Sequence, residues 1–485
     1  MVREKTIKSV KDPEVKWQCM ATNWKIGFAL VVGAALAASS FGYIVWQRAN
    51  APTRPNNVGE ITKRENTKPT TSQILSDQEV QQGFLIMDNP DPMVHTIVHP
   101  NSPCWLEIPR DTASILPLGH TQNSVDLGYV GPESCAECHK REYDSFVKTP
   151  HYNTSSAASA KTVLGPFEPG HNQMLSQHPD LSFTMLQKPD GTLEQIVNFR
   201  ELKRNFNFDI SIGSGKIAQT YLYWHHDALY QLHVTYFRAL NSWINSPGYG
   251  DGTAWFSRRV IPKCFQCHMT YIDWYPGTEH MYSQDKIIYG VTCERCHGPG
   301  EEHVNYHREN MDERVGKFIS NPADLEPARA NDVCGQCHSG SADFVGPSFG
   351  FRPGDELTQH WRPAAAGPGV ENKVHTANQL QRLELSACYK NTDNMRCNQC
   401  HDPHRAEHGN LQLFSERCIK CHQPETCGEF EMLGAAISEN CIDCHLGLES
   451  DEKINIQTAN SMISPPLRDH FIRIIPEKNA STWTK

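Results

Sequence analysis

The chain has 485 residues, 38% of them hydrophobic, and a formal net charge of −10. This length allows one large domain or two or three smaller ones. The acidic balance and the absence of a long basic stripe argue against a nucleic-acid-binding protein, and a charged content of 21% is too low for a disordered polyelectrolyte. The 18 cysteines and 24 histidines are high numbers for a soluble enzyme of this size.

A hydrophobic segment near the start of the chain, Ile26–Trp46, holds 21 residues without a charge. A helix of this length spans a hydrocarbon layer of about 30 Å, so we predict a transmembrane anchor. Six basic and three acidic residues precede it, and the positive-inside rule then places residues 1–25 in the cytoplasm. The alternative is a signal peptide cleaved near Ala35–Ala37. The anchor predicts a single-pass inner (cytoplasmic) membrane protein with its bulk on the periplasmic or extracytoplasmic side.

Residues 47–125 follow the predicted anchor. Their first part is polar and contains Pro52, Pro55 and Pro69, which is typical of a flexible tether. From residue 77 onward the segment has apolar residues but no clear period, and the sequence assigns it no structure.

The remainder, residues 126–485, contains the motif Cys-x-x-Cys-His seven times. Chance would produce far less than one copy in a chain of this composition. The copies, called sites 1 to 7 in chain order, are Cys135–Cys138–His139, Cys264–Cys267–His268, Cys293–Cys296–His297, Cys334–Cys337–His338, Cys397–Cys400–His401, Cys418–Cys421–His422 and Cys441–Cys444–His445.

The spacing of this motif is that of c-type heme attachment. Two thiols separated by two residues reach the two vinyl groups of one heme and form thioethers, and the histidine that follows is held beneath the iron as its proximal ligand. We therefore predict seven covalently attached heme c groups, each with its iron. A zinc ribbon does not require a histidine after the second cysteine, and seven redox disulfides in one exported chain would be unusual.

Seven proximal histidines leave 17 others, which is enough to give most irons a second imidazole. The Gly298–Gly300 turn bends the chain away from site 3, so His303 is expected to reach a neighbouring iron. The candidates for distal ligands are His151, His280, His303, His375, His404 and His470, and weaker ones are His225, His226, His233 and His307.

Sites 2 to 7 lie within 182 residues, from Cys264 to His445. That is about 30 residues per heme, too few to enclose each heme in its own domain, so the hemes are expected to supply much of the core and to pack against one another. Between sites 1 and 2, aromatic and β-branched residues alternate over Ser211–Phe237, which predicts β-hairpins within a β-rich insertion at about residues 180–260.

Four cysteines lie outside the motifs. Cys19 falls on the predicted cytoplasmic side, and Cys104 has no obvious mate. Cys388 and Cys427 flank sites 5 and 6, and a disulfide between them is one option in an oxidising compartment. The sequence does not decide the connectivity.

Four blocks of sequence give the chain a family resemblance: GYVGPESCAECHKREYDSFVKTPHY, SPGYGDGTAWFSRRVIPKCFQCH, YGVTCERCHGPGEEHV and CNQCHDPH. From about Gly128 to His470 the chain resembles the multiheme c-type cytochromes related to the tetraheme cytochromes of nitrifying bacteria and, more distantly, to hydroxylamine oxidoreductase. The resemblance implies a mostly helical core with stacked and angled heme pairs. It also implies that His151, His303 and His404 are distal ligands.

The chain departs from the catalytic relatives of this family. It has no Cys-x-x-Cys-Lys motif, and it has seven attachment sites where hydroxylamine oxidoreductase is expected to have eight. No block matches the cross-linking tyrosine of that enzyme. These departures weaken an assignment as an enzyme.

We therefore expect a mainly α fold with irregular loops, consisting of a multiheme cytochrome c core, a small β insertion and the N-terminal membrane helix. The expected function is electron transfer along closely packed, mostly bis-histidine hemes. The alternative is an oxidoreductase acting on a small nitrogen or sulfur compound at one heme with an open sixth position. Expected partners are redox proteins, with quinol or a respiratory complex as further options, and no nucleic acid.

Overall fold

Strands are nearly as abundant as helices in this protein. The computed structural model describes residues 74–116, 127–340, 342–363, 373–375, 377–450, 456–457 and 462–475, which belong to one compact unit, residues 69–485. Helix makes up 28% and strand 26% of the structure. The prediction of a mainly α fold is therefore wrong.

The first sheet lies in the segment that the sequence left unassigned. It contains β1 (Leu85–Met87), β2 (Val94–Val98) and β3 (Trp105–Pro109), and β14 (Thr253–Trp255) completes it by pairing parallel to β3. The short helix α3 (Asp77–Gln81) precedes this sheet and is capped by the Ser76 side chain. The parallel pairing joins the start of the described chain to the segment just before site 2.

Two further sheets follow along the chain, one of four strands and one of six. One is antiparallel and has the order β5 (Gln173–Leu175), β6 (Leu181–Gln187), β7 (Leu193–Phe199) and β8 (Leu202–Asn207). The other has the order β13 (Ser242–Asn245), β12 (Val234–Phe237), β10 (Ala218–His225), β9 (Ile210–Ile212) and β4 (Ser155–Ala157), with β11 (Ala228–Gln231) also paired to β10. The hairpins predicted over Ser211–Phe237 are confirmed by the pairing of β9, β10 and β11.

The main hydrophobic core lies between these sheets and consists of ordinary side chains. Phe183, Phe199, Tyr221, Tyr230 and Phe256 are among its fully buried members. By contrast, the cluster around sites 2 to 4 has only four buried members, Val333, Phe351, Leu357 and Trp361, with Cys267 and Cys296 packed against it. A further buried cluster, which includes Phe265 of site 2 and Tyr129 shortly before site 1, packs around β15 (Met269–Trp274) and β16 (Tyr282–Tyr289).

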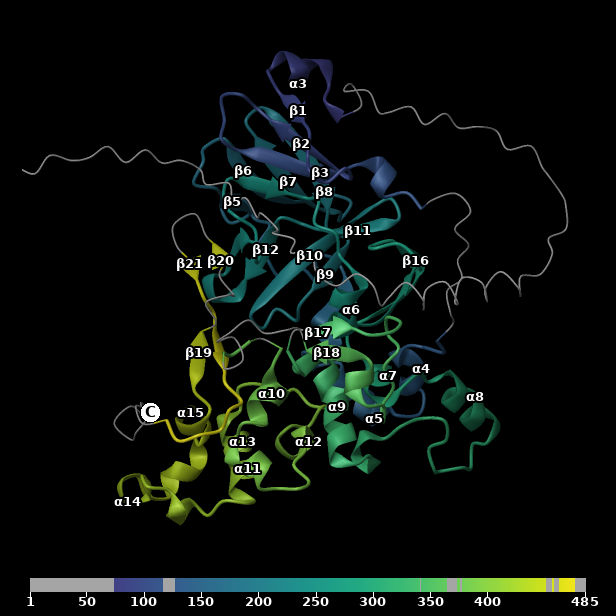
Figure 1. Cartoon of the computed structure of the whole chain (residues 1–485), viewed down its shortest axis with the longest axis vertical. Coiled ribbons are helices and arrows are strands. Elements are labelled where there is room, and N and C mark those ends of the chain that lie inside the picture. Colours follow the sequence, from purple (N-terminus) through teal and green to yellow (C-terminus); the bar gives the residue numbers. More distant parts are fainter. Residues whose placement is uncertain are drawn as a thin grey trace, which may run out of the picture. The chain divides into compact units, whose positions relative to one another are not determined.

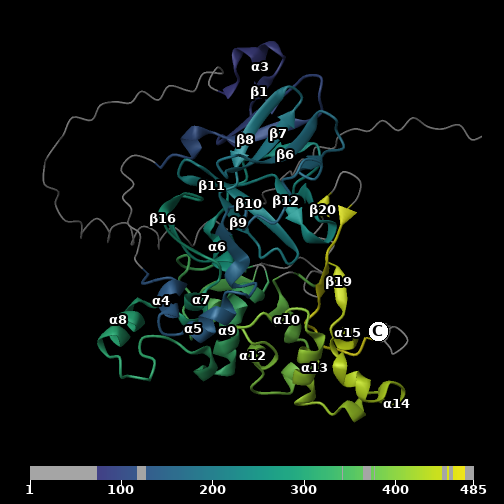
Figure 2. The same ribbon diagram turned by 180° about the vertical axis from the view of Figure 1, so that it is seen from behind.

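Short helices carry the motifs in the second half of the unit. Figures 1 and 2 show the strands labelled from β1 to β12 toward one end of residues 69–485 and helices α9 to α15 toward the other, with β19 (Leu448–Ser450) beside these helices. The helices that contain or adjoin the motifs are α4 (Pro132–Ala136), α5 (Lys140–Phe146), α6 (Pro262–His268), α7 (Cys293–His297), α8 (Glu301–Glu309), α9 (Pro327–His338), α10 (Gln379–Leu383), α11 (Ala387–Lys390), α12 (Cys397–Cys400), α13 (Leu411–Ile419), α14 (Phe430–Leu433) and α15 (Ile442–His445).

Four two-stranded pairs complete the unit. After α6 the chain forms β15 (Met269–Trp274) and β16 (Tyr282–Tyr289), and further on β17 (Ala342–Phe344) pairs with β18 (Trp361–Pro363). Near the C-terminus β19 (Leu448–Ser450) pairs with β22 (Pro466–Arg468), and β20 (Ile456–Gln457) pairs with β21 (Met462–Ile463). Strands thus extend on both sides of the predicted range of about 180–260.

The predicted membrane anchor and inner-membrane localisation also need correction. Within the described ranges, no helix is long and apolar enough to cross a bilayer. Residues 26–46, to which the anchor was assigned, lie outside the described residues, as do the predicted cytoplasmic segment and Cys19. The single-pass arrangement therefore has no structural support and is dropped.

Candidate functional site

Each motif uses one turn of helix to bring its reactive groups to one side. Residues three and four positions apart share a helix face, so the two cysteines and the following histidine of a Cys-x-x-Cys-His turn lie together. At three sites a proline near the start of the helix favours its formation, because proline at the first position lacks only an N–H that would have no partner there. These prolines are Pro132, Pro262 and Pro327.

Four motif histidines each face a histidine from elsewhere in the chain. The ring centroids lie 6.4 Å apart for His139 and His303, and 6.2 Å apart for His338 and His151. They lie 6.1 Å apart for His297 and His404, and 6.3 Å apart for His401 and His470. Sites 1, 4, 3 and 5 thus each hold two imidazoles at nearly the same separation.

This separation fits one iron between two imidazoles. An imidazole nitrogen binds such a metal at about 2.0–2.1 Å and lies about 1.1–1.2 Å from the centre of its own ring, so two rings across one ion have centroids about 6.2–6.6 Å apart. The four observed separations, from 6.1 to 6.4 Å, agree with that value. Directly stacked rings would lie much closer.

Five of the motif and candidate histidines have a hydrogen-bond acceptor at Nδ1. His297 donates from Nδ1 to the carbonyl oxygen of Ser320 at 2.8 Å, and His303 donates from Nδ1 to that of Lys317 at 2.8 Å. Such bonds fix the tautomer and leave Nε2 unprotonated for a metal. The same arrangement holds for His338 with Gln379 Oε1 at 2.9 Å, His445 with the Arg473 carbonyl at 3.0 Å and His470 with the Arg468 carbonyl at 3.2 Å.

Burial keeps several of these imidazoles neutral. Desolvation, with a smaller contribution from His338, lowers the pKa of His151 to about 4, and desolvation with the nearby His470 lowers the pKa of His401 to about 4. The neutral imidazole is the form that binds iron. His151 and His401 are therefore in the neutral form that ligation requires.

The other candidate histidines lie elsewhere. His280, in the turn between β15 and β16, is buried, and its Nε2 lies 2.9 Å from the Tyr230 hydroxyl, beside the main hydrophobic core. His375 accepts a hydrogen bond at Nδ1 from the Ala377 N–H. In the described part of the chain, neither has its ring opposite that of a motif histidine. His233 stacks on Phe183, and His307 lies beside His303.

Three motif histidines lack a facing imidazole among the described residues: His268, His422 and His445. His268 of site 2 is the most enclosed of them, and burial lowers its pKa. Its Nδ1 lies 3.0 Å from Thr154 Oγ1, and Ser155 Oγ donates to its backbone carbonyl.

Cysteines of different motifs lie near enough to shift one another's pKa, a feature that the sequence did not reveal. Hydrogen bonding to Cys293 and burial raise the pKa of Cys135. Hydrogen bonding to Cys337 and burial likewise raise the pKa of Cys267. Cys441 has the same effect on the pKa of Cys418. The thiol pairs link sites 1 and 3 (Cys135–Cys293), sites 2 and 4 (Cys267–Cys337), sites 4 and 5 (Cys334–Cys397) and sites 6 and 7 (Cys418–Cys441).

Residues between the motif cysteines hold neighbouring sites together. Arg295 of site 3 is buried and donates from Nε and Nη2 to the carbonyl oxygen of Gln266 in site 2. Gln336 of site 4 donates from Nε2 to the carbonyl oxygen of Arg295 at 3.1 Å. Sites 2, 3 and 4 are thus linked by the variable positions of their own motifs.

Glu294 of site 3 links that motif to site 1. Its carboxylate is buried and accepts hydrogen bonds from the backbone N–H groups of Val130, Gly131 and Gly300, each at 2.8 Å. Burial is the main influence on this group and raises its pKa. One side chain therefore orients the chain before site 1 and the turn that leads to His303.

The chain is similar to several known proteins. The family described as cytochrome c554 and c-prime matches residues 249–298, which contain sites 2 and 3. A multiheme cytochrome, MtrA of Shewanella baltica (strain OS185), is 24% identical over 200 residues, covering 39% of this chain and 54% of the relative. These matches support a multiheme c-type cytochrome family for the chain. The cytochrome thus binds covalent c-type heme with iron.

Two further matches extend over more of the cytochrome. The dissimilatory sulfite reductase MccA of Wolinella succinogenes is 23% identical over 393 residues, covering 66% of this chain and 50% of the relative. The structure of the outer cell wall cytochrome OcwA matches with a TM-score of 0.45 and 14% identity, covering 72% of this chain and 80% of that one. The cytochrome spans about half the length of the curated relatives that it matches.

The remaining cysteines do not form the disulfide that was considered. Cys388 and Cys427 are free thiols in the structure, as is the buried Cys104. Burial and then the nearby Cys388 thiol raise the pKa of Cys400 of site 5. Burial and then the nearby Cys427 thiol raise the pKa of Cys444 of site 7. Both extra cysteines therefore lie beside attachment sites.

Proposed function

We propose that this cytochrome transfers electrons along a row of seven covalently attached hemes, most of them ligated by two histidines. The observation that carries this proposal is the closeness of cysteines from different motifs. The rate of electron transfer falls steeply with distance, and thiols that lie near one another attach to porphyrin edges that are close together. Heme, when bound, supplies the one-electron chemistry.

The order of the row follows from the order of these thiol pairs. Sites 1 and 3 are joined by their first cysteines, and Cys296 of site 3 lies within electrostatic range of Cys334 of site 4. Site 4 lies beside site 5, whose Cys400 lies within range of Cys421 of site 6, and site 6 lies beside site 7. The proposed row is therefore 1–3–4–5–6–7, with site 2 as a branch beside site 4.

The chain tunes this row through the histidines and their hydrogen bonds. An Nδ1–H that donates to a carbonyl oxygen makes the other nitrogen a stronger ligand, which stabilises oxidised iron. The heme reduction potential at a site with such a bond, or at a site buried from water, should therefore differ from that at a solvent-exposed site. The motif helices hold the imidazoles in place, so little rearrangement accompanies a change of charge.

Protein-film voltammetry tests the proposal. The film should give a continuous, reversible envelope that integrates to seven electrons per chain in the absence of any substrate. Isolated groups of hemes that fail to equilibrate on the timescale of the scan would contradict a connected row. Redox proteins are the proposed partners, with a quinol-oxidising respiratory complex as one such class, and co-purification in mild detergent identifies them.

A second candidate function is catalysis at site 2 on a small nitrogen or sulfur compound. Two observations favour it: His268 faces no imidazole in the described part of the chain and, as the most enclosed of the three such motif histidines, has its pKa lowered by burial, and a relative is named a dissimilatory sulfite reductase. The site would need an exchangeable sixth position. A high-spin heme that changes its spectrum with sulfite, hydroxylamine or CO supports catalysis, whereas an all-low-spin protein that ignores them supports transfer alone.

A further inference from the structure

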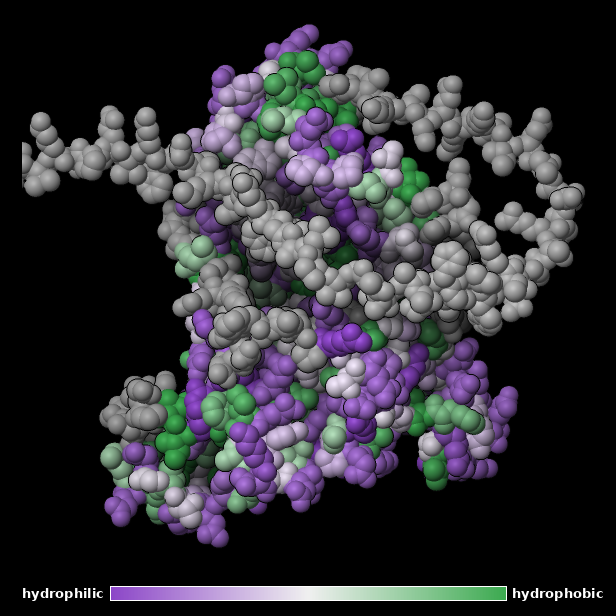
Figure 3. Space-filling view, in the orientation of Figure 1, coloured by the Kyte–Doolittle hydropathy of each residue, from purple (hydrophilic) through white to green (hydrophobic). Residues whose placement is uncertain are grey.

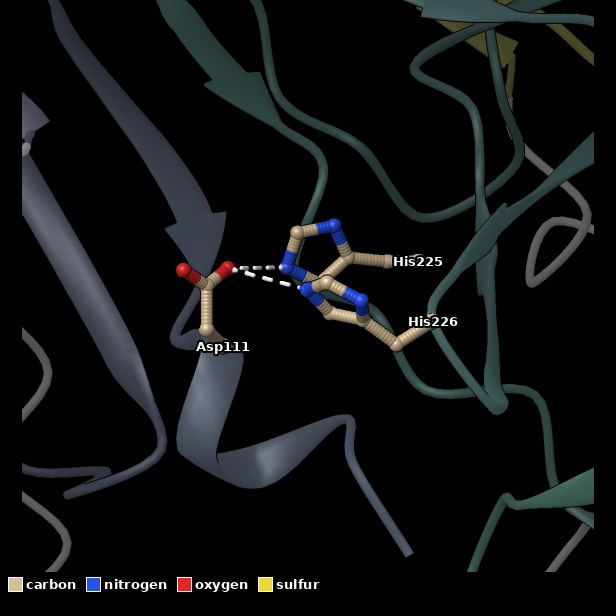
Figure 4. Close-up of side chains that lie close together, drawn as sticks. All are labelled: Asp111, His225 and His226. Atoms are coloured by element: carbon tan, nitrogen blue, oxygen red, sulfur yellow. Dashed lines mark ion pairs between the residues drawn. The ribbon is translucent and has the colours of Figure 1, made fainter.

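A cluster of possible metal ligands lies far from the motifs in sequence. Asp111, His225 and His226 each offer one ligand atom, and these atoms all lie within 4.8 Å of one another. Asp111 Oδ1 lies 3.0 Å from His225 Nε2 and 3.4 Å from His226 Nε2. Figure 4 shows both rings turned toward the same carboxylate.

These distances are those expected between ligands of one ion. Ligands at about 2.0–2.1 Å in a tetrahedral site lie about 3.3–3.4 Å from one another. The two observed separations, 3.0 and 3.4 Å, bracket that value. Two imidazoles and one carboxylate are a donor set for divalent transition metals, whereas magnesium and calcium prefer oxygen ligands alone.

The backbone conformation at His226 makes this convergence possible. His225 ends β10 and pairs with Ala228 of β11, so His226 and Asp227 form a two-residue turn. Successive side chains in a strand point to opposite faces, which would separate the two rings. His226 has φ of 54°, a left-handed conformation that is unfavourable for a residue with a side chain. This turn brings its ring to the side occupied by His225.

The nitrogen of His225 that faces Asp111 is buried, and the Asp111 carboxylate oxygen lies 3.0 Å from it. When no ion is bound, a proton shared in an ion pair holds these two atoms together. A divalent cation can take the place of that proton, because it also removes the repulsion between the nitrogen lone pair and the carboxylate.

Hydrogen bonds outside the cluster hold its two parts together. The Asp227 N–H donates to the Ser114 carbonyl at 2.9 Å, and the Leu116 N–H donates to Asp227 Oδ2 at 2.8 Å. The Ser114 and Tyr230 hydroxyls lie 3.0 Å apart. The segment that carries Asp111 is therefore fixed against the β10–β11 turn before any ion binds.

We propose that Asp111, His225 and His226 bind one divalent transition-metal ion of the zinc class. Asp111 and His226 are exposed, at 74% and 45% of their side-chain surface, which leaves room for water on the outer side of the ion. The ion crosslinks the segment after β3 to the β10–β11 turn. This site is independent of the attachment motifs and of the proposed electron transfer.

Zinc titration of the intact heme-loaded protein tests the site. Zinc is redox-silent, so the heme spectrum reports only on folding. After treatment with a chelator, calorimetry with ZnCl2 compares wild type with Asp111→Asn and His226→Gly, because glycine accepts the left-handed turn while removing the imidazole. His171→Ala removes an exposed histidine elsewhere and serves as the control.

We expect wild type and His171→Ala to bind one zinc ion at this site with equal affinity. In Asp111→Asn and His226→Gly the affinity of that site should fall by at least about tenfold. Equal zinc binding by all four proteins overturns the proposal. Anomalous scattering at the zinc edge gives a second measurement that does not depend on the variants. A zinc peak between the three side chains supports the site, and peaks elsewhere with none here refute it.

Discussion

Replacing Asp469 by asparagine tests how the chain holds a proposed distal ligand, because Asp469 directly precedes His470. Its carboxylate is fully buried and accepts hydrogen bonds from Arg382 Nε and Nη2, both at 2.8 Å, while the Arg382 side chain is 6% exposed. Arg473 Nη1 and the Phe471 N–H donate to the same carboxylate. Two cations therefore depend on this one buried charge.

The Asp469→Asn variant keeps the volume of the side chain and one oxygen acceptor but removes the charge. Removing one partner of a buried ion pair costs about 3–5 kcal/mol, since the strongest electrostatic interaction of the remaining charge is lost. We expect that loss in the free energy of unfolding, measured by urea titration at neutral pH. We also expect His470 to shift, so that one low-spin heme signal becomes high-spin in EPR.

Asp144→Asn is the matched control. Asp144 pairs with Lys140 at 2.8 Å, but 54% and 74% of the two side chains are exposed. Water screens such a pair, and its loss costs about 0.3–0.5 kcal/mol. If Asp469→Asn destabilises the protein no more than Asp144→Asn, or leaves every heme signal unchanged, the buried pair does not support site 5.

Three further predictions concern other parts of the cytochrome. His303→Ala should convert one low-spin signal to high-spin, whereas the neighbouring His307→Ala should not; equal EPR spectra for the two variants would contradict the pairing of His303 with site 1. Glu294→Gln leaves a buried backbone N–H without an acceptor and should cost about 1–3 kcal/mol in urea unfolding, with the exposed Glu133→Gln as its neutral control. Glu79 has its pKa lowered to about 2, chiefly by hydrogen bonds from Arg204, so the attachment of α3 to β8 should be stable above pH 4.5 and weaken as the pH falls toward 2. The protection of the backbone amides of residues 77–81 against hydrogen exchange measures the stability of this contact. The pH dependence of that protection should vanish in Glu79→Gln.

The angles between paired rings give a more detailed prediction for EPR. The ring planes differ by 12°, 22° and 25° at sites 3, 1 and 5, but by 71° at site 4. Nearly parallel axial imidazoles give rhombic low-spin spectra, and nearly perpendicular ones give a strongly anisotropic signal. Rhombic signals should therefore outnumber the anisotropic type by three to one among these sites. His151→Ala should remove the anisotropic signal selectively.

The attachment motifs and several distal candidates could be found from the sequence because their chemistry is local. A Cys-x-x-Cys-His turn places its groups within five residues. The assignment of distal ligands to sites is not local: His151 lies 12 residues after His139 but faces His338 of site 4. The route of the chain through space decides such pairs, and spacing along the sequence does not reveal it.

The strand content was underestimated for a related reason. β12 and most of β15 are buried at successive positions, so the alternation that marks a half-buried strand is missing. The first sheet is completed by β14, about 150 residues away along the chain. The Asp111 cluster escaped notice because its carboxylate follows β3, whereas its two histidines lie at the β10–β11 turn, more than 100 residues later.

The mass of the intact purified protein tests the central claim most directly. Thioether attachment at all seven motifs predicts a single species heavier than the polypeptide by seven hemes, with a pyridine hemochrome assay giving seven heme c per chain. A mass with no bound porphyrin, or with consistently fewer than seven from a host that matures c-type cytochromes, would contradict the account.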